Sequence, residues 1–215
     1  MSRLFLSLVS LWCGTAVAAA APSCPAGGEG WSTRCFSLDG ESRKVQPRYL
    51  KRLRWNRYGI ALVSLHDRFE LLAVNRQGEV VVPNIRHTGD FDYPDAEGGV
   101  GRFGTPDHRK CGYFQAPRFT IVVPARYDHC TAFHDGEALA CTGCTEYCDD
   151  EDCHMHHWIG GEGVVLDPAG AVRGTFQPPM LETVCGKSGQ PTITPRPGTS
   201  LLQCPRGADP FDHLK

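Results

Sequence analysis

Cysteine and histidine, the side chains best suited to metal binding and redox chemistry, are concentrated in one short segment. Between residues 141 and 157 the sequence carries Cys141, Cys144, Cys148, Cys153, His154, His156 and His157. Thiolates and imidazoles are the ligands that Zn²⁺ and Cu⁺ prefer in proteins. One interpretation is therefore a metal site whose ligands are Cys141, Cys144, His156 and His157.

The favoured alternative is that the four cysteines of this segment form two disulfides. They would then hold an exposed, acidic loop that also carries the histidines. A redox-active Cys-x-x-Cys pair is disfavoured, because the acidic run 149–152 follows it and nearby carboxylates raise a thiol pKa.

The first twenty residues predict export. Arg3 precedes an apolar run over residues 4–12, and the small residues of 16–20 provide an Ala-x-Ala cleavage site, as in a Sec-type signal peptide. A lipoprotein is disfavoured because Pro22 disrupts the lipobox before Cys24. No later segment reaches the ~18 apolar residues of a membrane span. The mature chain is expected to be periplasmic or secreted, with no transmembrane segment.

The cysteine count supports disulfides in the mature chain. Cleavage removes Cys13 from the eleven cysteines and leaves ten, an even number that is typical of paired cysteines in an exported protein. Short loops favour two pairs near the ends, and a third pair could form across one repeat unit. These pairs are Cys24 with Cys35, Cys185 with Cys204, and Cys111 with Cys130.

The cysteine-rich segment also qualifies as a binding loop. It interrupts an otherwise regular strand pattern, and insertions of this kind often carry binding residues. A loop held by cysteines loses less conformational entropy on binding than a free one. The candidate contact residues are Glu146, Asp149, Asp150, Asp152, His154, His156, His157 and Trp158.

A basic stretch is the competing surface. Residues 43–57 contain seven Lys or Arg and no acid. Tyr49 and Trp55 lie among them, and Tyr58 follows directly. Such a composition suits an anionic polymer. No nucleic-acid-binding motif accompanies it, so nucleic acid is not a favoured partner and a solvated strand face is the simpler interpretation.

Searches for catalytic motifs are negative. The sequence contains no Gly-x-Ser-x-Gly and no His-Glu-x-x-His. Gly186-Lys187-Ser188 resembles the end of a phosphate-binding loop, but Leu181 stands where the first glycine is required. We therefore expect a protein that is not an enzyme and that needs no cofactor.

The elements that must position these residues recur along the chain. Three segments contain a proline after apolar or polar residues, at 45–49, 81–85 and 122–127. In each case a glycine follows 12 to 15 residues after the proline and begins a small apolar run. Short runs rich in Val, Ile, Leu and Phe, separated by Gly-containing turns, predict strands. Because proline cannot donate a ladder hydrogen bond, Pro47, Pro83 and Pro124 are expected at equivalent strand ends, after buried valines.

Residues 110–141 carry a resemblance to a known family. The matching residues are Lys110, Gly112, Tyr113, Val123, Pro124, Tyr127, Asp128, Phe133, Gly136 and Ala138. In this order and spacing they resemble one unit of the bacterial WG-repeat family, and weaker similarity extends over residues 35–180. The namesake Trp-Gly pair is absent, and Cys111 takes the tryptophan position. The resemblance implies a β-rich repeat protein with no known catalytic residues.

Together these features predict an all-β fold, an array of about three to four short β-meander units with a disulfide-rich insert. A flank over 21–34 precedes the repeat domain 35–185, and 186–215 forms an extended tail. The predicted units lie at about 35–65, 69–103, 110–141 and 161–180, with the insert at 141–158. The expected function is a binding scaffold for a protein or an envelope polymer. The alternative is a periplasmic zinc- or copper-binding protein.

Overall fold

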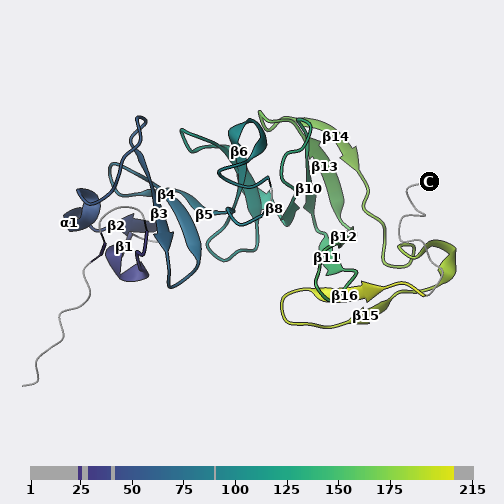
Figure 1. Cartoon of the computed structure of the whole chain (residues 1–215). Coiled ribbons are helices and arrows are strands. Elements are labelled where there is room, and N and C mark those ends of the chain that lie inside the picture. Colours follow the sequence, from purple (N-terminus) through teal and green to yellow (C-terminus); the bar gives the residue numbers. More distant parts are fainter. Residues whose placement is uncertain (1–23, 26–28, 40–41, 90, 206–215) are drawn as a thin grey trace, which may run out of the picture.

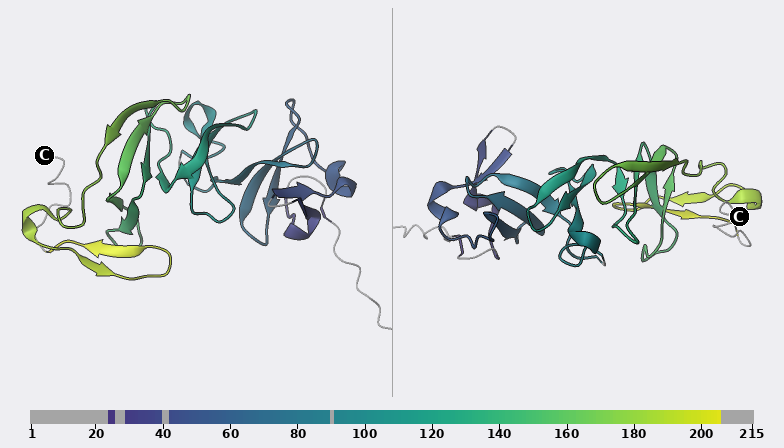
Figure 2. Two further views of the ribbon diagram at one scale, coloured as in Figure 1. Left: turned by 180° about the vertical axis from the view of Figure 1, so that it is seen from behind. Right: turned by 90° about the horizontal axis from the view of Figure 1, so that it is seen from above.

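The computed structural model describes residues 24–25, 29–39, 42–89 and 91–205, and the predicted signal peptide lies outside these ranges. Within them the chain forms four β-sheets and only short helices, which confirms the all-β prediction. The sheets follow one another in an elongated row that ends in a C-terminal hairpin (Figures 1 and 2). No helix of the described part is long and apolar enough to cross a membrane.

The N-terminal end of the row is built around Trp31, which is fully buried. Its ring packs edge-on against Phe36 and Tyr49, with ring centroids 6.4 and 6.2 Å away. The elements here are a 3-10 helix (Thr33–Cys35), the hairpin of β1 (Phe36–Asp39) and β2 (Ser42–Val45), and the one-turn α1 (Pro47–Leu50).

The largest sheet has six antiparallel strands in sequence order. They are β3 (Ile60–Leu65), β4 (Glu70–Asn75), β5 (Val80–Ile85), β6 (Val100–Gly104), β7 (Cys111–Gln115) and β8 (Thr120–Tyr127), with a 3-10 helix (Glu97–Gly99) before β6. A single register pair, Ile85 with Phe103, joins β5 to β6. The sheet is therefore two three-stranded meanders that meet at this junction, and the junction leaves space beside the end of β5.

A second sheet continues the row in the order β14-β13-β10-β9. Its strands are β9 (His129–Cys130), β10 (Ala138–Thr142), β13 (Glu162–Leu166) and β14 (Val172–Phe176). Strands β10, β13 and β14 form another antiparallel meander. The cysteine-rich insert lies between β10 and β13, so it interrupts this meander in sequence without breaking the pairing of its strands.

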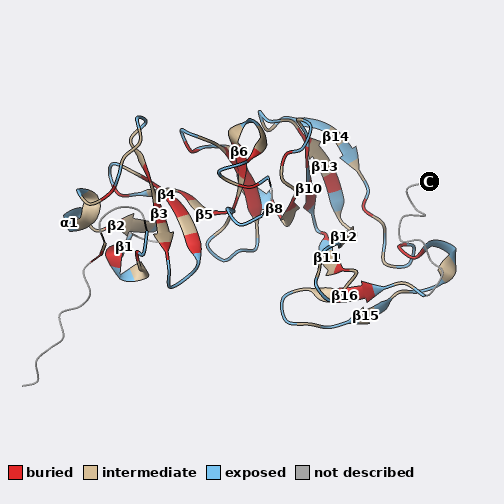
Figure 3. Cartoon of the chain, in the orientation of Figure 1, coloured by how far each residue is buried: buried red, intermediate tan, exposed pale blue. Residues whose placement is uncertain are grey.

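Most of the residues that carry the family resemblance are buried in the interior of this part of the chain, although Pro124 is exposed. Tyr113 and Phe133 are fully buried, with ring centroids 5.1 Å apart. The Tyr113 hydroxyl donates to the Thr131 carbonyl at 2.9 Å, and burial raises the pKa of Tyr113. Figure 3 shows the buried residues as bands along the strands of successive sheets. The resemblance therefore rests on residues that stabilise the fold.

The prediction for the three prolines is wrong in part. Val82 and Val123 are buried as expected, but Pro83 and Pro124 lie within β5 and β8. The register of each strand with its neighbour shifts at the proline, so the missing N–H coincides with a β-bulge. Pro47 begins α1 instead of ending a strand, because its fixed φ also suits the first position of a helix.

The bulge at Pro124 explains why glycine occupies position 112. A Cβ on Gly112 would lie 2.7 Å or less from backbone atoms of Val123, Pro124 and Ala125. Only glycine allows this approach, so the bulge at Pro124 on β8 requires Gly112 on the neighbouring strand β7.

The predicted extended tail is also partly wrong. Residues after the 3-10 helix (Gly186–Ser188) form a hairpin of β15 (Thr192–Thr194) and β16 (Ser200–Gln203). Strand β16 pairs in parallel with β11 (Thr145–Cys148), whose other neighbour is β12 (His156–Ile159). The insert is thus a hairpin of β11 and β12 within a sheet, and β16 of the C-terminal segment pairs with the other side of β11. Residues 206–215 lie outside the described part.

Candidate functional site

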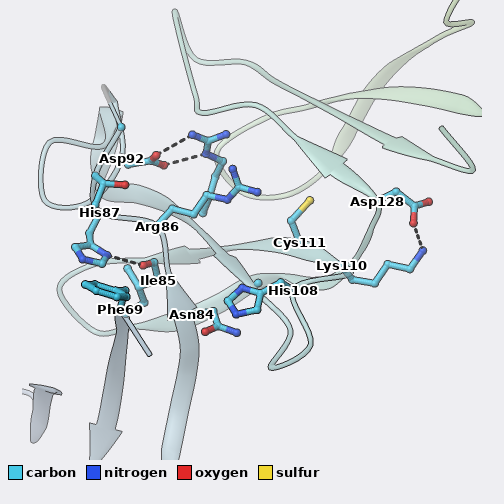
Figure 4. A pocket seen from close by; sticks show the side chains of 14 residues that line it. Phe69, Asn84, Ile85, Arg86, His87, Asp92, His108, Lys110, Cys111 and Asp128 are labelled. Atoms are coloured by element: carbon cyan, nitrogen blue, oxygen red, sulfur yellow. Dashed lines mark hydrogen bonds and ion pairs between the residues drawn. The ribbon is translucent and has the colours of Figure 1, made fainter. Parts of the chain in front are cut away.

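A polar pocket of about 500 Å³ opens beside the junction of β5 and β6. Its walls come from the end of β5 and the following loop, from β6, from the β6–β7 turn and from the end of β8 (Figure 4). The Cys111–Cys130 disulfide fixes one wall to β9 of the next sheet. The pocket therefore lies where two sheets are covalently tied together.

Most charges in the pocket are already paired. Arg102 makes two hydrogen bonds to the carboxylate of Asp92, at 2.9 and 2.8 Å, and its remaining amino group donates to the Cys130 carbonyl. Asp92 is only 4 % exposed, so this is a nearly buried ion pair. Lys110 pairs with Asp128 at the other side of the pocket.

Asp128 also accepts a hydrogen bond from the backbone amide of Gly143, at 2.7 Å. Desolvation opposes ionisation of Asp128, but the bonds from Lys110 and Gly143 outweigh this effect and lower its pKa. The Asp128 carboxylate therefore stays ionised near neutral pH and connects β7 to the base of the insert.

Arg86 is the cation of the pocket that has no acidic partner in the described part of the chain. Its side chain extends into the space between Asp92 and Cys111 (Figure 4). Loss of hydration and repulsion by Arg102 lower the pKa of Arg86, and the fields of Asp92 and Glu146 offset only part of this. An anion bound beside Arg86 would relieve this repulsion.

Asn84 gives the pocket an unused acceptor. The residue is 7 % exposed, its Nδ2 donates to the Thr105 carbonyl, and its Oδ1 is buried with no hydrogen-bond partner in the described structure. A buried acceptor without a donor costs about 1–3 kcal/mol. Its φ of 40° is a conformation that asparagine tolerates better than most residues. Asn84 therefore places a buried, unsatisfied acceptor in the wall of the pocket.

An exposed aromatic side chain lies at the rim of the pocket. Phe69 is 92 % exposed and stands beside His87, whose Nδ1 bonds the Ile85 carbonyl at 3.0 Å (Figure 4). Exposed aromatic rings next to a polar pocket are typical contact residues of binding surfaces. The pocket thus offers a cation and, at its rim, an aromatic face to one ligand, and its wall contains the unsatisfied acceptor of Asn84.

The predicted binding loop is more ordered than the sequence suggests. Glu146 on β11 accepts a hydrogen bond from the Trp158 indole at 3.1 Å, and it lies within 3.5 Å of His129 and 3.7 Å of His156. The Trp158 ring stacks on His129 with centroids 5.9 Å apart. Of the other predicted contact residues, His154 Nδ1 lies 3.3 Å from Asp150 Oδ2 and His157 Nε2 lies 3.6 Å from Asp149 Oδ2, and Asp152 is exposed.

All ten cysteines of the predicted mature chain are paired in the described structure. The three pairings expected from spacing, Cys24–Cys35, Cys111–Cys130 and Cys185–Cys204, are present. The insert contains Cys141–Cys144 and Cys148–Cys153. The predicted ligand set Cys141, Cys144, His156 and His157 is not brought together among the described residues; the donor atoms that lie within 4.8 Å of one another are those of Cys148, Cys153 and His156.

Sequence analysis missed the pocket itself. Arg86, Asp92 and Arg102 belong to no motif, and Asn84 belongs only to the prolyl segment 81–85. The four residues come together where β5 and β6 meet at one register pair. The available signal was Asn84, which stands after Val-Val-Pro at a strand position where a short polar side chain is unusual.

Comparison with known proteins adds no further assignment. No family model matches the chain, and no curated protein matches it.

Proposed function

We propose that this chain is an exported, non-catalytic β-repeat protein of the WG-repeat type that binds a macromolecule through the pocket beside β5 and β6. The partner, a protein or an envelope polymer, inserts an anionic group that also carries an O–H or N–H donor. The observation that carries the proposal is the presence in one pocket of Arg86, which forms no ion pair among the described residues, and of Asn84, whose Oδ1 has no hydrogen-bond partner there.

Two further features support binding in an exported compartment. Five disulfides among the described residues are typical of proteins from oxidising environments. The carboxylates of the pocket, Asp92 and Asp128, are held in ion pairs, whereas a general base must be able to take up a proton. The pocket is therefore better suited to holding a charged group than to proton transfer.

The first prediction is that Arg86→Gln weakens capture of the partner from a native envelope extract at least tenfold. The change removes the positive charge and leaves a shorter, neutral polar side chain, and a charge-assisted hydrogen bond contributes about 1.5–3 kcal/mol. Immobilised wild-type and variant proteins are compared by titrating the captured material. Arg68→Gln, an exposed residue of the β3–β4 turn, is the matched control. Equal capture by wild type and Arg86→Gln would refute binding of the partner through the pocket.

Free acids identify the group that the pocket recognises. Galacturonate presents a carboxylate with hydroxyl donors, and N-acetyl-aspartate presents carboxylates with an amide N–H. Competition by galacturonate indicates an acidic glycan, and competition by N-acetyl-aspartate indicates an acidic protein segment. Failure of both at millimolar concentration would contradict an anionic ligand.

A second candidate function is soft-metal binding by the insert under reducing conditions. The Cys153 Sγ lies 3.5 Å from His156 Nδ1. Two ligands of a tetrahedral zinc with Zn–S and Zn–N distances near 2.3 and 2.0 Å stand about 3.6 Å apart. After a dithiol reduces the Cys148–Cys153 disulfide, its two thiolates and the imidazole could take up one Zn²⁺ or Cu⁺.

The second prediction tests this candidate. Native protein should show no alkylatable thiols, and protein reduced with excess dithiol and then freed of reductant should retain about one zinc per chain. Cys148→Ser/Cys153→Ser should abolish retention, whereas Cys141→Ser/Cys144→Ser should keep it. Metal retained equally by the first variant would contradict this ligand set.

A further inference from the structure

A second surface lies on the N-terminal side of the large sheet, where three arginines are stacked on two aromatic rings. The guanidinium carbons of Arg57 and Arg118 each lie 4.9 Å from the centre of the Tyr58 ring, and that of Arg76 lies 5.2 Å from the Trp55 ring. We call Trp55, Arg57, Tyr58, Arg76 and Arg118 the arginine–aromatic surface. All but the half-buried Trp55 are exposed.

Three separate segments assemble this surface and hydrogen bonds hold them in place. Asn56 Nδ2 donates to the Pro117 carbonyl at 3.0 Å, which ties the loop before β3 to the β7–β8 turn. Asn56 Oδ1 accepts from the amides of Tyr58 and Ile60, and so fixes the loop itself. Because the loop is fixed, the arginines are presented without a large ordering cost.

Arg76 comes from the β4–β5 turn and packs across a glycine. A Cβ on Gly59, whose φ is 75°, would lie 3.2 Å from Arg76 Nε. Arg57, Tyr58, Gly59 and Arg76 also line a shallow pocket of about 400 Å³. The surface is therefore hollowed between its arginines.

None of the three arginines has an acidic partner in the described part of the chain. Arg43, Arg102 and Arg173, by contrast, all form ion pairs with carboxylates. A guanidinium stacked on an aromatic face keeps its edge N–H groups free, and these groups fit carboxylate and sulfate oxygens. Three uncompensated cations at one place call for a ligand with several negative charges.

We propose that the arginine–aromatic surface binds an acidic polysaccharide, whose carboxylate or sulfate groups repeat along the polymer. Five disulfides indicate an oxidising compartment, where such polymers occur and nucleic acids are not the usual anionic polymers. Binding of single-stranded nucleic acid uses aromatic faces for base stacking. Here guanidinium groups already lie over the rings of Tyr58 and Trp55, which favours charge over base stacking as the means of recognition.

The test measures binding of the mature protein to polygalacturonate, which carries carboxylates, and to heparin, which adds sulfates, with neutral dextran as the blank. We expect Arg57→Gln/Arg76→Gln/Arg118→Gln to weaken binding at least tenfold at low salt. The plot of log affinity against log salt should become less steep by about two, because a variant with fewer ion contacts releases fewer counterions when it binds. Binding to both polymers indicates recognition of negative charge, and binding to heparin alone assigns the surface to sulfate.

The matched control is Arg34→Gln/Arg68→Gln/Lys187→Gln, which removes the same charge from exposed positions outside the surface. It should bind within twofold of wild type. The triple variant leaves Arg86 intact, so failure of this proposal, seen as unchanged polymer binding by the triple variant, and failure of the pocket, seen as equal capture by Arg86→Gln, are separate results. Arg118→Gln alone provides a milder variant, expected to show a partial loss with an unchanged melting temperature.

Three outcomes would overturn the proposal. They are unchanged binding by the triple variant, an equal loss in the control, and tighter binding of a DNA oligomer than of either polysaccharide. The last result would assign the surface to nucleic acid.

Discussion

Replacing Cys111 and Cys130 together by serine should lower the free energy of unfolding by about 2–5 kcal/mol. The disulfide closes a loop of sequence separation 19 and joins β7 of the large sheet to β9 of the next sheet. Both cysteines are buried, at 3 % and 5 % exposure, so two hydroxyl groups would also enter an apolar cluster. Urea denaturation followed by tryptophan fluorescence measures the change.

Cys185→Ser/Cys204→Ser is the matched control for loop length. That disulfide has the same sequence separation, but Cys204 is only partly buried. The two double variants lose a similar loop-closure entropy, so the Cys111/Cys130 variant should be the less stable one. A loss below 1 kcal/mol for Cys111/Cys130 would contradict the role given to this disulfide.

Replacing Asp92 by asparagine should cost about 3–5 kcal/mol, the typical effect of leaving one buried charge without its partner. Arg102 would remain largely buried, at 16 % side-chain exposure, with its positive charge uncompensated. Thermal and urea denaturation of the variant give the loss directly. Asp107→Asn is the control, because its ion pair with Arg109 is exposed and should matter little.

A double variant separates the cost of the unpaired charge from the value of the ion pair. Asp92→Leu/Arg102→Met removes both charges, and exchange of a buried pair for apolar side chains is often neutral. It should therefore be more stable than Asp92→Asn. If Asp92→Asn is no less stable than Asp107→Asn, the buried Asp92–Arg102 ion pair does not stabilise the pocket wall.

Local sequence signals predicted those parts of the molecule that depend on neighbours along the chain. Alternating apolar runs and Gly-containing turns identified the strands, and short spacing identified Cys24–Cys35 and Cys185–Cys204. The burial of Val82 and Val123 followed from their place in apolar runs. These features need no knowledge of how the sheets are arranged.

Features that depend on distant contacts were missed. The hairpin of β15 and β16 is stabilised by parallel pairing with β11, about fifty residues earlier, and a Pro- and Thr-rich sequence gives no sign of that partner. Pro47 was misplaced because the same backbone angle suits a strand end and the first turn of a helix. The pocket combines residues from several loops, and none of these residues is distinctive by itself.

Ligand binding by the pocket beside β5 and β6 is tested most directly by an NMR titration. ¹⁵N-labelled mature protein is titrated with galacturonate and with N-acetyl-aspartate, and amide and arginine side-chain shifts are followed. We predict that at least one acid shifts the resonances of Arg86, Gly104 and Lys110 in a saturable manner, and that Arg86→Gln abolishes these shifts. Saturable shifts confined to other surfaces, or shifts that persist in Arg86→Gln, would contradict the account.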